Sequence, residues 1–252
     1  MSHLPDYYII IPARLASSRL PRKVLLDIAG QPMLVWVADA AKKSNAKGLW
    51  VATDSQEVAA VCNQFNLPYV ITQSHHTSGT ERLAEAASLL GLNEDAIIVN
   101  VQADEPLIEP TLIDELALCL AKTTASVATL AHPIHTEEEF HNHNMVKVVL
   151  NHQQEALYFS RSLIPFPRQI RTDLPVLRHI GLYAYRAHFL HWYSTLKPSV
   201  LEQVESLEQL RILYYGKKIY VEVTSTTPSV GVDTEKDLQY VSQLLHKRRE
   251  AL

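Results

Sequence analysis

The sequence predicts an α/β protein built on a mostly parallel sheet with helices on both faces. In its first half, short runs rich in Val, Ile and Tyr alternate with segments whose apolar residues recur at helical spacing. Such alternation is typical of parallel sheets, because helices cover both of their faces. The chain has 252 residues, 47% of them hydrophobic, which is enough for one sizeable core. We therefore expect a single domain over residues 1–252.

The first element is a strand at residues 7–11, YYIII, which ends at a proline. The pattern then repeats, with strands at 48–53, 69–72 and 96–102 and helices at 33–44, 55–65 and 79–91. From about residue 126 to about residue 215, β-rich stretches predict a smaller lobe with antiparallel or mixed pairing. We expect loops at 135–144 and 164–175, a helix at 203–215, a further strand, and a last helix whose Thr234 and Asp237 form a capping box.

Composition restricts the partners of this protein. The net charge is −4, so general nucleic-acid binding, which requires many Lys and Arg side chains, is not expected. The two cysteines, Cys62 and Cys119, lie far apart in predicted helices, and we expect buried free thiols. Neither a secretion signal nor an apolar run of membrane-spanning length is visible. These features predict a cytoplasmic protein without a membrane partner.

A cluster of positive charge follows the first strand. Arg14, Arg19, Arg22 and Lys23 fall within ten residues, and the loop that carries them contains no glycine. Glycine-rich phosphate loops are thereby excluded, so side-chain cations would have to bind an anion. Ligands of parallel sheets bind beyond the carboxyl ends of the strands, which favours a small-anion site here. The alternative is a solvated loop.

Two acidic positions are candidate metal ligands. Asp104 and Glu105 follow the predicted strand at 96–102, where a carboxylate near a phosphate site could hold Mg²⁺. Alternatively, Asp104 caps the next helix. Asp233 precedes the last helix and on its own is a cap or turn residue. It becomes a second ligand only if the fold brings it beside Asp104.

Further polar residues occur at element ends. Ser78 and Gly79 open a predicted helix and Arg82 lies one turn into it, so backbone groups could meet the edge of a ligand there. We interpret His75 and His76 as surface residues rather than metal ligands. In the β-rich half, polar residues beside apolar strands suggest a carbohydrate-type pocket, formed by Arg161, Arg168, His179, Tyr183, Glu208 and Gln209.

Several motifs occur in one order over almost the whole chain. They are IIPARLASSRLPRK, VATD, TSGTERLAEA, IVNVQADEP, RHIGLYAYR, LEQLRILYYG and GVDT. Together they closely resemble the 3-deoxy-manno-octulosonate (Kdo) cytidylyltransferase family. The resemblance implies a Rossmann-like fold of the nucleotide-diphospho-sugar transferase type, in which the smaller lobe also makes a homodimer contact. It implies transfer of CMP from CTP to Kdo with Mg²⁺, for lipopolysaccharide biosynthesis.

The resemblance also implies roles for single residues. Arg14, Arg19 and Lys23 correspond to positions that hold the CTP phosphates, and Asp104 and Asp233 to the Mg²⁺ ligands. The positions around the cytosine are Ala13, Ser78, Gly79 and Arg82, with Gln102 between nucleotide and reacting sugar. The positions that line the Kdo side are Arg161, Arg168, His179, Tyr183, Glu208 and Gln209. Lys23, Arg19, Asp104 and Asp233 would carry the catalysis.

Two departures from the family pattern stand out. Arg22 and Ala103 replace glycines of the family motifs LPGKP and QGDEP. Either replacement would be strained if its position required a positive φ angle. Two other functions remain open: a related nucleotidyltransferase, such as a CMP-sialic acid synthetase or a sugar-1-phosphate enzyme, and a non-catalytic nucleotide-binding regulator on the same fold.

Overall fold

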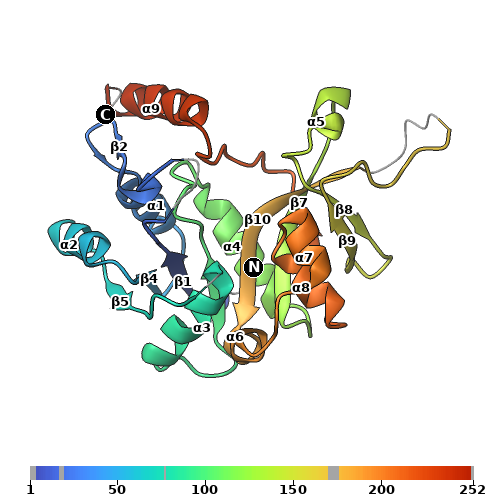
Figure 1. Ribbon diagram of the computed structural model, residues 1–252, viewed down its shortest axis with the longest axis horizontal. Helices are drawn as coiled ribbons and strands as arrows, with labels where there is room; N and C mark the ends of the chain where they lie inside the picture. Colours follow the sequence, from blue (N-terminus) through green and yellow to red (C-terminus); the bar gives the residue numbers. More distant parts are fainter. Residues whose placement is uncertain (1–3, 17–19, 77, 170–175, 251–252) are drawn as a thin grey trace.

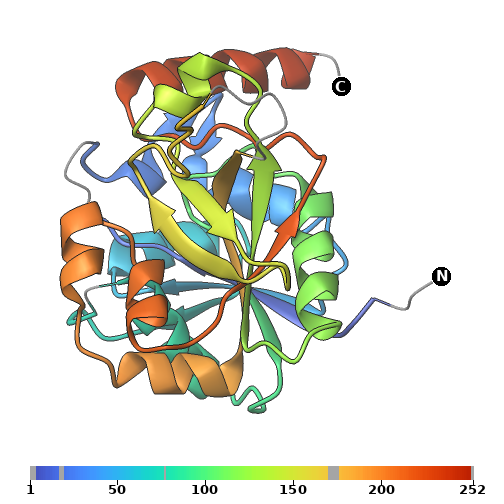
Figure 2. The same ribbon diagram turned by 90° about the vertical axis from the view of Figure 1, so that its right-hand side faces the viewer.

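The computed structural model describes residues 4–16, 20–76, 78–169 and 176–250. These residues form a nine-stranded mixed sheet with helices on both faces (Figures 1 and 2). Neighbouring strands follow the order β11-β7-β10-β6-β1-β4-β5, while β8 pairs with β10 and β9. The central strands β6, β1, β4 and β5 are parallel, and β10 is antiparallel to each of its neighbours. The predicted fold class is confirmed.

The first half follows the predicted alternation closely. Its strands are β1 (Tyr7–Pro12), β4 (Gly48–Thr53), β5 (Tyr69–Ile71) and β6 (Ile97–Asn100). Its helices are α1 (Met33–Ala41), α2 (Gln56–Gln64), α3 (Gly79–Leu89) and α4 (Pro110–Ala121). Serine side chains begin two of them: Ser55 Oγ accepts from the N–H of Val58 at 3.4 Å, and Ser78 Oγ from that of Glu81 at 3.1 Å.

The alternation of side chains along β1 explains the layers. Ile9 and Ile11 pack with Leu116 of α4 in one core cluster, whereas Ile10 packs with Leu83 of α3 in another. Successive residues of a strand point to opposite faces, so a continuous apolar run requires cover on both sides. All three isoleucines are fully buried, and the burial of each side chain stabilises the fold by about 1.5–3 kcal/mol. Cys62 and Cys119 are buried free thiols, as predicted.

The second half adds the antiparallel part of the sheet. Its elements are β7 (Val127–Pro133), α5 (Glu137–His141), β8 (Lys147–Leu150), β9 (Ala156–Ser160), β10 (Leu177–Arg186), α6 (Ala187–Ser194), α7 (Val200–Glu205), α8 (Gln209–Tyr214) and β11 (Tyr220–Val223). The β8–β9 hairpin projects from one end of the sheet, beside α5 (Figure 1).

Two expectations for this half were wrong. The segment expected to be a loop contains the short helix α5, which begins because Thr136 Oγ1 accepts from the N–H of Glu139 at 3.2 Å. The single helix expected at 203–215 is two helices, α7 and α8. They are separated at Ser206, whose φ of 53° is left-handed and ends the first helix.

The last helix, α9 (Glu235–Glu250), stabilises the basic segment near the N-terminus. Its Val241 and Leu245 share a buried cluster with Ile28 of β2 (Asp27–Ile28), which pairs with β3 (Gln31–Pro32) and follows the 3₁₀ helix η1 (Lys23–Leu25). The capping box predicted for Thr234 and Asp237 is present, with bonds of 3.2 and 2.8 Å. Within the described ranges, no helix combines the length and apolar character that crossing a membrane requires.

Candidate active site

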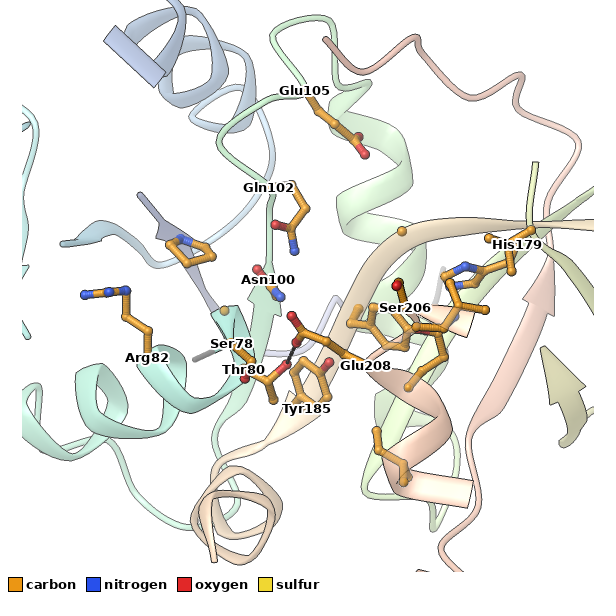
Figure 3. A pocket seen from close by; sticks show the side chains of 18 of the residues that line it. Ser78, Thr80, Arg82, Asn100, Gln102, Glu105, His179, Tyr185, Ser206 and Glu208 are labelled. Atoms are coloured by element: carbon orange, nitrogen blue, oxygen red, sulfur yellow. Dashed lines mark hydrogen bonds between the residues drawn. The ribbon is translucent and has the colours of Figure 1, made fainter. Parts of the chain in front are cut away.

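A cavity of about 480 Å³ lies at the carboxyl ends of β1 and β6, between α3 and α8 (Figure 3). Its volume is in the usual range for small-molecule sites. Of the residues singled out in the sequence, those that line it are Arg14, His76, Ser78, Gly79, Arg82, Gln102, Glu105, His179, Tyr183, Glu208, Gln209 and Asp233. Side chains from both halves of the chain therefore face one space.

Lys23 joins the two candidate metal ligands. Its Nζ lies 2.6 Å from Asp104 Oδ2 and 3.0 Å from Asp233 Oδ1. Burial alone would lower the pKa of the Lys23 ammonium, but the two carboxylates raise the pKa above its ordinary value. The two acidic oxygens are thus close enough to bind one cation.

Main-chain contacts explain why these aspartates meet. Asp104 lies in the turn after β6, and its carbonyl accepts from the N–H of Val232 at 2.8 Å. Val232 is fully buried, which fixes the neighbouring Asp233 at the cavity. Asp104 is not the cap of α4, because that helix begins at Pro110 with Glu109 at its N-cap. The alternative interpretation of Asp104 as a cap is therefore excluded.

The start of α3 forms one wall of the cavity. Ser78 is its N-cap and Gly79 its first residue, and both line the cavity. Arg82, only 3% exposed, points away from Glu208 (Figure 3). Its guanidinium donates to Thr72 Oγ1 and lies 3.4 Å from Asp54 Oδ2. The Arg82 cation is consequently held in place before any ligand arrives.

A second, smaller space adjoins this wall. Its volume is about 310 Å³, and Arg14, His76 and Arg82 line both cavities. His76, which we interpreted as a surface residue, is instead partly buried, and its Nε2 lies 2.5 Å from Glu85 Oε2. Glu85 Oε2 also accepts from the N–H of Gln73 at 2.9 Å, so it holds the segment before α3 against the helix.

The opposite wall is aromatic and polar. His179 Nε2 lies 3.1 Å from Thr129 Oγ1, and the ring packs against Phe159 and Tyr183. Burial lowers the pKa of His179 to about 3, so the imidazole is neutral at pH 7. Burial also raises the pKa of Tyr183 and Tyr185, which keeps both phenols protonated. This wall offers neutral hydrogen-bonding groups.

Glu208 joins the two walls. Its Oε2 accepts from Thr80 Oγ1 at 3.1 Å, across the cavity floor (Figure 3). Surrounding protein atoms raise the pKa of the Glu208 carboxyl, although solvent reaches it through the cavity. The next residue, Gln209, is 7% exposed and also lines the cavity.

Some buried polar atoms at the cavity have no protein partner. Within the described part of the chain, Asn100 Oδ1 and the Tyr193 hydroxyl make no hydrogen bond, although both residues line the cavity. An unsatisfied buried polar group costs about 1–3 kcal/mol. A ligand with hydroxyl or amino groups would satisfy these atoms.

Not every predicted residue reaches the cavity. Arg161 donates to the carbonyls of Glu205 and His143 at 2.8 and 3.2 Å and does not line the cavity, and exposed Arg168 does not line it either. Ala13 is buried, with its N–H donating to Ala52, between the lining residues that flank it. Arg19 lies outside the described residues.

The sequence reasoning missed some lining residues. Arg178, one residue before His179, is one of them, whereas Glu105, which also lines the cavity, was singled out beside Asp104 as a candidate metal ligand. Burial, with a contribution from Asp104, raises the pKa of Glu105 to about 7. Asn100 could have been found, because it is a polar residue within the apolar run IIVNV. No comparable signal distinguishes Arg178 from other strand arginines.

The fold and the arrangement of charged residues at the cavity indicate the class of enzyme. Cations follow the first strand, two carboxylates share one ammonium, and one of them, Asp233, lines the same polar cavity as the N-terminus of α3. Such a combination of charged groups is typical of a nucleotidyltransferase, which must hold a triphosphate and a second substrate together. Residues 8–219 match the cytidylyltransferase family, and the chain belongs to that family.

Two relatives of this chain share one specific name within that family. The chain is 50% identical over 247 residues to the 3-deoxy-manno-octulosonate cytidylyltransferase of Polynucleobacter necessarius subsp. necessarius (strain STIR1), covering 97% of each. It is 48% identical to the protein of that name from Pasteurella multocida (strain Pm70), covering 97% of this chain and all of the relative. A solved CMP:2-keto-3-deoxy-manno-octonic acid synthetase complexed with CTP superposes with a TM-score of 0.89 at 40% identity, covering 97% of this chain and 100% of that one.

Proposed function

We propose that this protein transfers CMP from CTP to Kdo, releasing CMP-Kdo and pyrophosphate. The observation that carries this is the convergence of Asp104, Asp233 and Lys23 at the edge of the sheet where Arg14 also lies. Relatives of that name, aligned over nearly the full chain, supply the substrate identities. The product would serve as the activated sugar for lipopolysaccharide biosynthesis.

The residues present fit a bound Mg²⁺ ion. Mg²⁺ in proteins takes one or two carboxylates and completes its shell with waters and substrate phosphates. Asp104 and Asp233 supply two carboxylates, and the described residues contain no cluster of three or more His, Cys, Asp or Glu placed for a metal. When bound, the ion would neutralise charge on the α-phosphate and the attacking hydroxyl.

In the reaction, the anomeric hydroxyl oxygen of Kdo forms a bond to the α-phosphorus of CTP, and the bond from that phosphorus to the bridging β-phosphate oxygen breaks. The hydroxyl proton passes to solvent, and pyrophosphate leaves with the electron pair. Protein side chains contribute positioning and charge. Lys23 and Arg14 would offset the phosphate charge, with Arg19 as a further candidate. Asp104 and Asp233 would fix the position of the ion.

The base would lie at the first turn of α3. Ser78 and Gly79 present backbone groups there, and Arg82 is already held by Asp54. Backbone donors and acceptors can distinguish cytosine from uracil by their pattern. Gln102, between this wall and the opposite one, would contact both substrates.

The sugar acid would lie against β10 and α8. His179, Tyr183, Glu208 and Gln209 would meet its hydroxyls. Arg161 and Arg168 were expected to contribute here, but among the described arginines of that region Arg178 is the one that lines the cavity. We assign the Kdo carboxylate to Arg178, because a guanidinium pairs well with a carboxylate.

The assay measures pyrophosphate release with CTP, Mg²⁺ and Kdo, each omitted in turn. The proposal predicts release only with all three present. UTP in place of CTP, or a sialic acid or sugar 1-phosphate in place of Kdo, tests the related transferases. Binding of CTP without turnover on any sugar would instead identify a nucleotide-binding regulator.

Two further features belong to this proposal. A homodimer through the β8–β9 hairpin is supported by the exposed Leu157 and Phe166, and by a groove of about 510 Å³ lined by residues such as Val148 of β8 and Pro165. A cytoplasmic location is supported by the free thiols.

A further inference from the structure

Arg211 of α8 is a buried cation bound by two carboxylates. It is 1% exposed, and its Nε and Nη2 donate to Glu202 at 2.7 and 2.6 Å. Its Nη1 donates to Glu81 Oε1 at 3.0 Å, and its guanidinium lies 4.8 Å from the centre of the Tyr193 ring. We call these four residues the Arg211 node. It joins α3, α6, α7 and α8.

The node lies next to the cavity, at the ends of the helices that line it. Glu81 is in the first turn of α3, three residues after Ser78. It accepts a hydrogen bond from Arg211, the third residue of α8. Three residues before Arg211, Glu208 accepts from Thr80 of the same α3 turn. Two polar bridges thus connect the wall proposed for the nucleotide to the wall proposed for the sugar acid.

Helix packing alone does not explain this node. Two carboxylates and one guanidinium meet in a region from which water is largely excluded. Apolar residues of similar size often stabilise such a place equally well or better. Ionic hydrogen bonds, however, fix direction and distance, as the bidentate contact with Glu202 illustrates. Their advantage lies in setting the relative position of α3 and α8.

We propose that Arg211 is a positioning residue that sets the spacing between the nucleotide wall and the sugar wall. It acts through Glu81 on Ser78 and Gly79, and through its own helix on Glu208. The inference rests on the proposed function, since the spacing matters when two substrates must react with each other. In-line transfer is sensitive to it, because a misplacement of about 1 Å can cost about 10²-fold in rate.

The test compares Arg211→Lys and Glu81→Gln with wild type, using pyrophosphate release per folded molecule at saturating CTP and Kdo. We expect kcat to fall about 10–100-fold for Arg211→Lys and about 3–10-fold for Glu81→Gln. The KM for each substrate should stay within about threefold, since each wall remains intact. Glu81→Gln keeps the Glu202 contact and the side-chain volume, and so should fold even if Arg211→Lys does not.

The matched control is Asp114→Asn. Asp114 lies on α4, which covers the other face of the sheet, and it accepts hydrogen bonds from Tyr7 and Asn45. This variant therefore removes a charge from a polar cluster away from the cavity. Its kcat should equal that of wild type. Unchanged kcat in both node variants, or a change confined to KM, would overturn the proposal.

A second readout does not depend on activity. Amide hydrogen exchange at Thr80–Arg82 should be faster in Glu81→Gln than in wild type, and unchanged in Asp114→Asn. If wild type releases no pyrophosphate, the proposed function fails, and this exchange still reports on the node. Equal exchange in wild type and Glu81→Gln would reject the positioning role by itself.

Discussion

At the residue scale, the arrangement around Lys23 is the most informative. Its ammonium contacts carboxylates 81 and 210 residues further along the chain, which only the folded sheet can bring together. A divalent cation would compete with the ammonium for the same oxygens. The same geometry therefore explains the ion pair of the free protein and supports the metal site proposed above.

A prediction at this scale concerns the charge of the sugar substrate. Arg178→Ala should raise the KM for Kdo about 10–100-fold and leave the KM for CTP nearly unchanged, because a charged hydrogen-bonded contact is worth about 1.5–3 kcal/mol. Steady-state pyrophosphate release measures both constants. Arg168→Ala is the control and should resemble wild type. The reverse result, a defect in Arg168→Ala alone, would assign the Kdo carboxylate to Arg168, as the family resemblance implies.

At this scale, the sequence indicates candidate residues where a side chain follows or begins a regular element. Lys23, Asp104 and the Ser78–Gly79 helix start were proposed because they lie beyond predicted strands or open a helix. The proximity of Asp233 to Asp104 was implied only by resemblance, since it depends on the bond between the Asp104 carbonyl and the N–H of Val232. Arg178 was missed although its neighbour His179 was expected in the pocket, because successive residues of a strand normally point to opposite faces.

At the scale of elements, the turn before η1 carries an unusual arginine. Arg22, where the family has glycine, has a φ of 57° and pairs with exposed Glu57 of α2. Its guanidinium is therefore directed toward α2 in this structure. Ala103 differs, because its φ is not positive, so its replacement of glycine introduces no backbone strain of this kind.

This turn yields a stability prediction. Arg22→Gly should be more stable than Arg22→Ala by about 1 kcal/mol, because both lose the ion pair but only glycine adopts the left-handed conformation without cost. Urea unfolding of the two variants measures the difference. Equal midpoints would show that the left-handed turn is not retained in solution.

Element prediction from the sequence succeeded for long periodic segments and failed at local turn chemistry. Strand β1 and helix α3 follow directly from apolar periodicity and the Ser78 cap. The break between α7 and α8 requires a left-handed Ser206, which serine rarely adopts and which apolar spacing does not reveal.

At the scale of the whole molecule, the sheet connects both halves of the chain around one cavity. Strand β10 lies between β7 and β6, so residues of the second half border the end of the first-half sheet. The sequence predicted the parallel half and the β-rich half separately. It could not show that β10 would enter between them, because strand order depends on long-range pairing.

The proposed dimer is also a property of this scale. Leu157 is 60% and Phe166 79% exposed, which favours an apolar contact between copies. Replacing both with Asp should convert a dimer into a monomer in light scattering coupled to size exclusion. Val204→Asp, at an equally exposed position on α7, should leave the mass unchanged. A dimer that survives the double replacement would place the interface elsewhere.

The most direct test of the site is a Mn²⁺ titration with CTP present, followed by electron paramagnetic resonance. Asp104→Asn and Asp233→Asn should each weaken Mn²⁺ binding at least about tenfold, because each removes one of two carboxylate ligands. Asp95→Asn, at an exposed carboxylate away from the cavity, should bind as wild type does. Wild-type Mn²⁺ affinity in both site variants would contradict a shared cation between these aspartates.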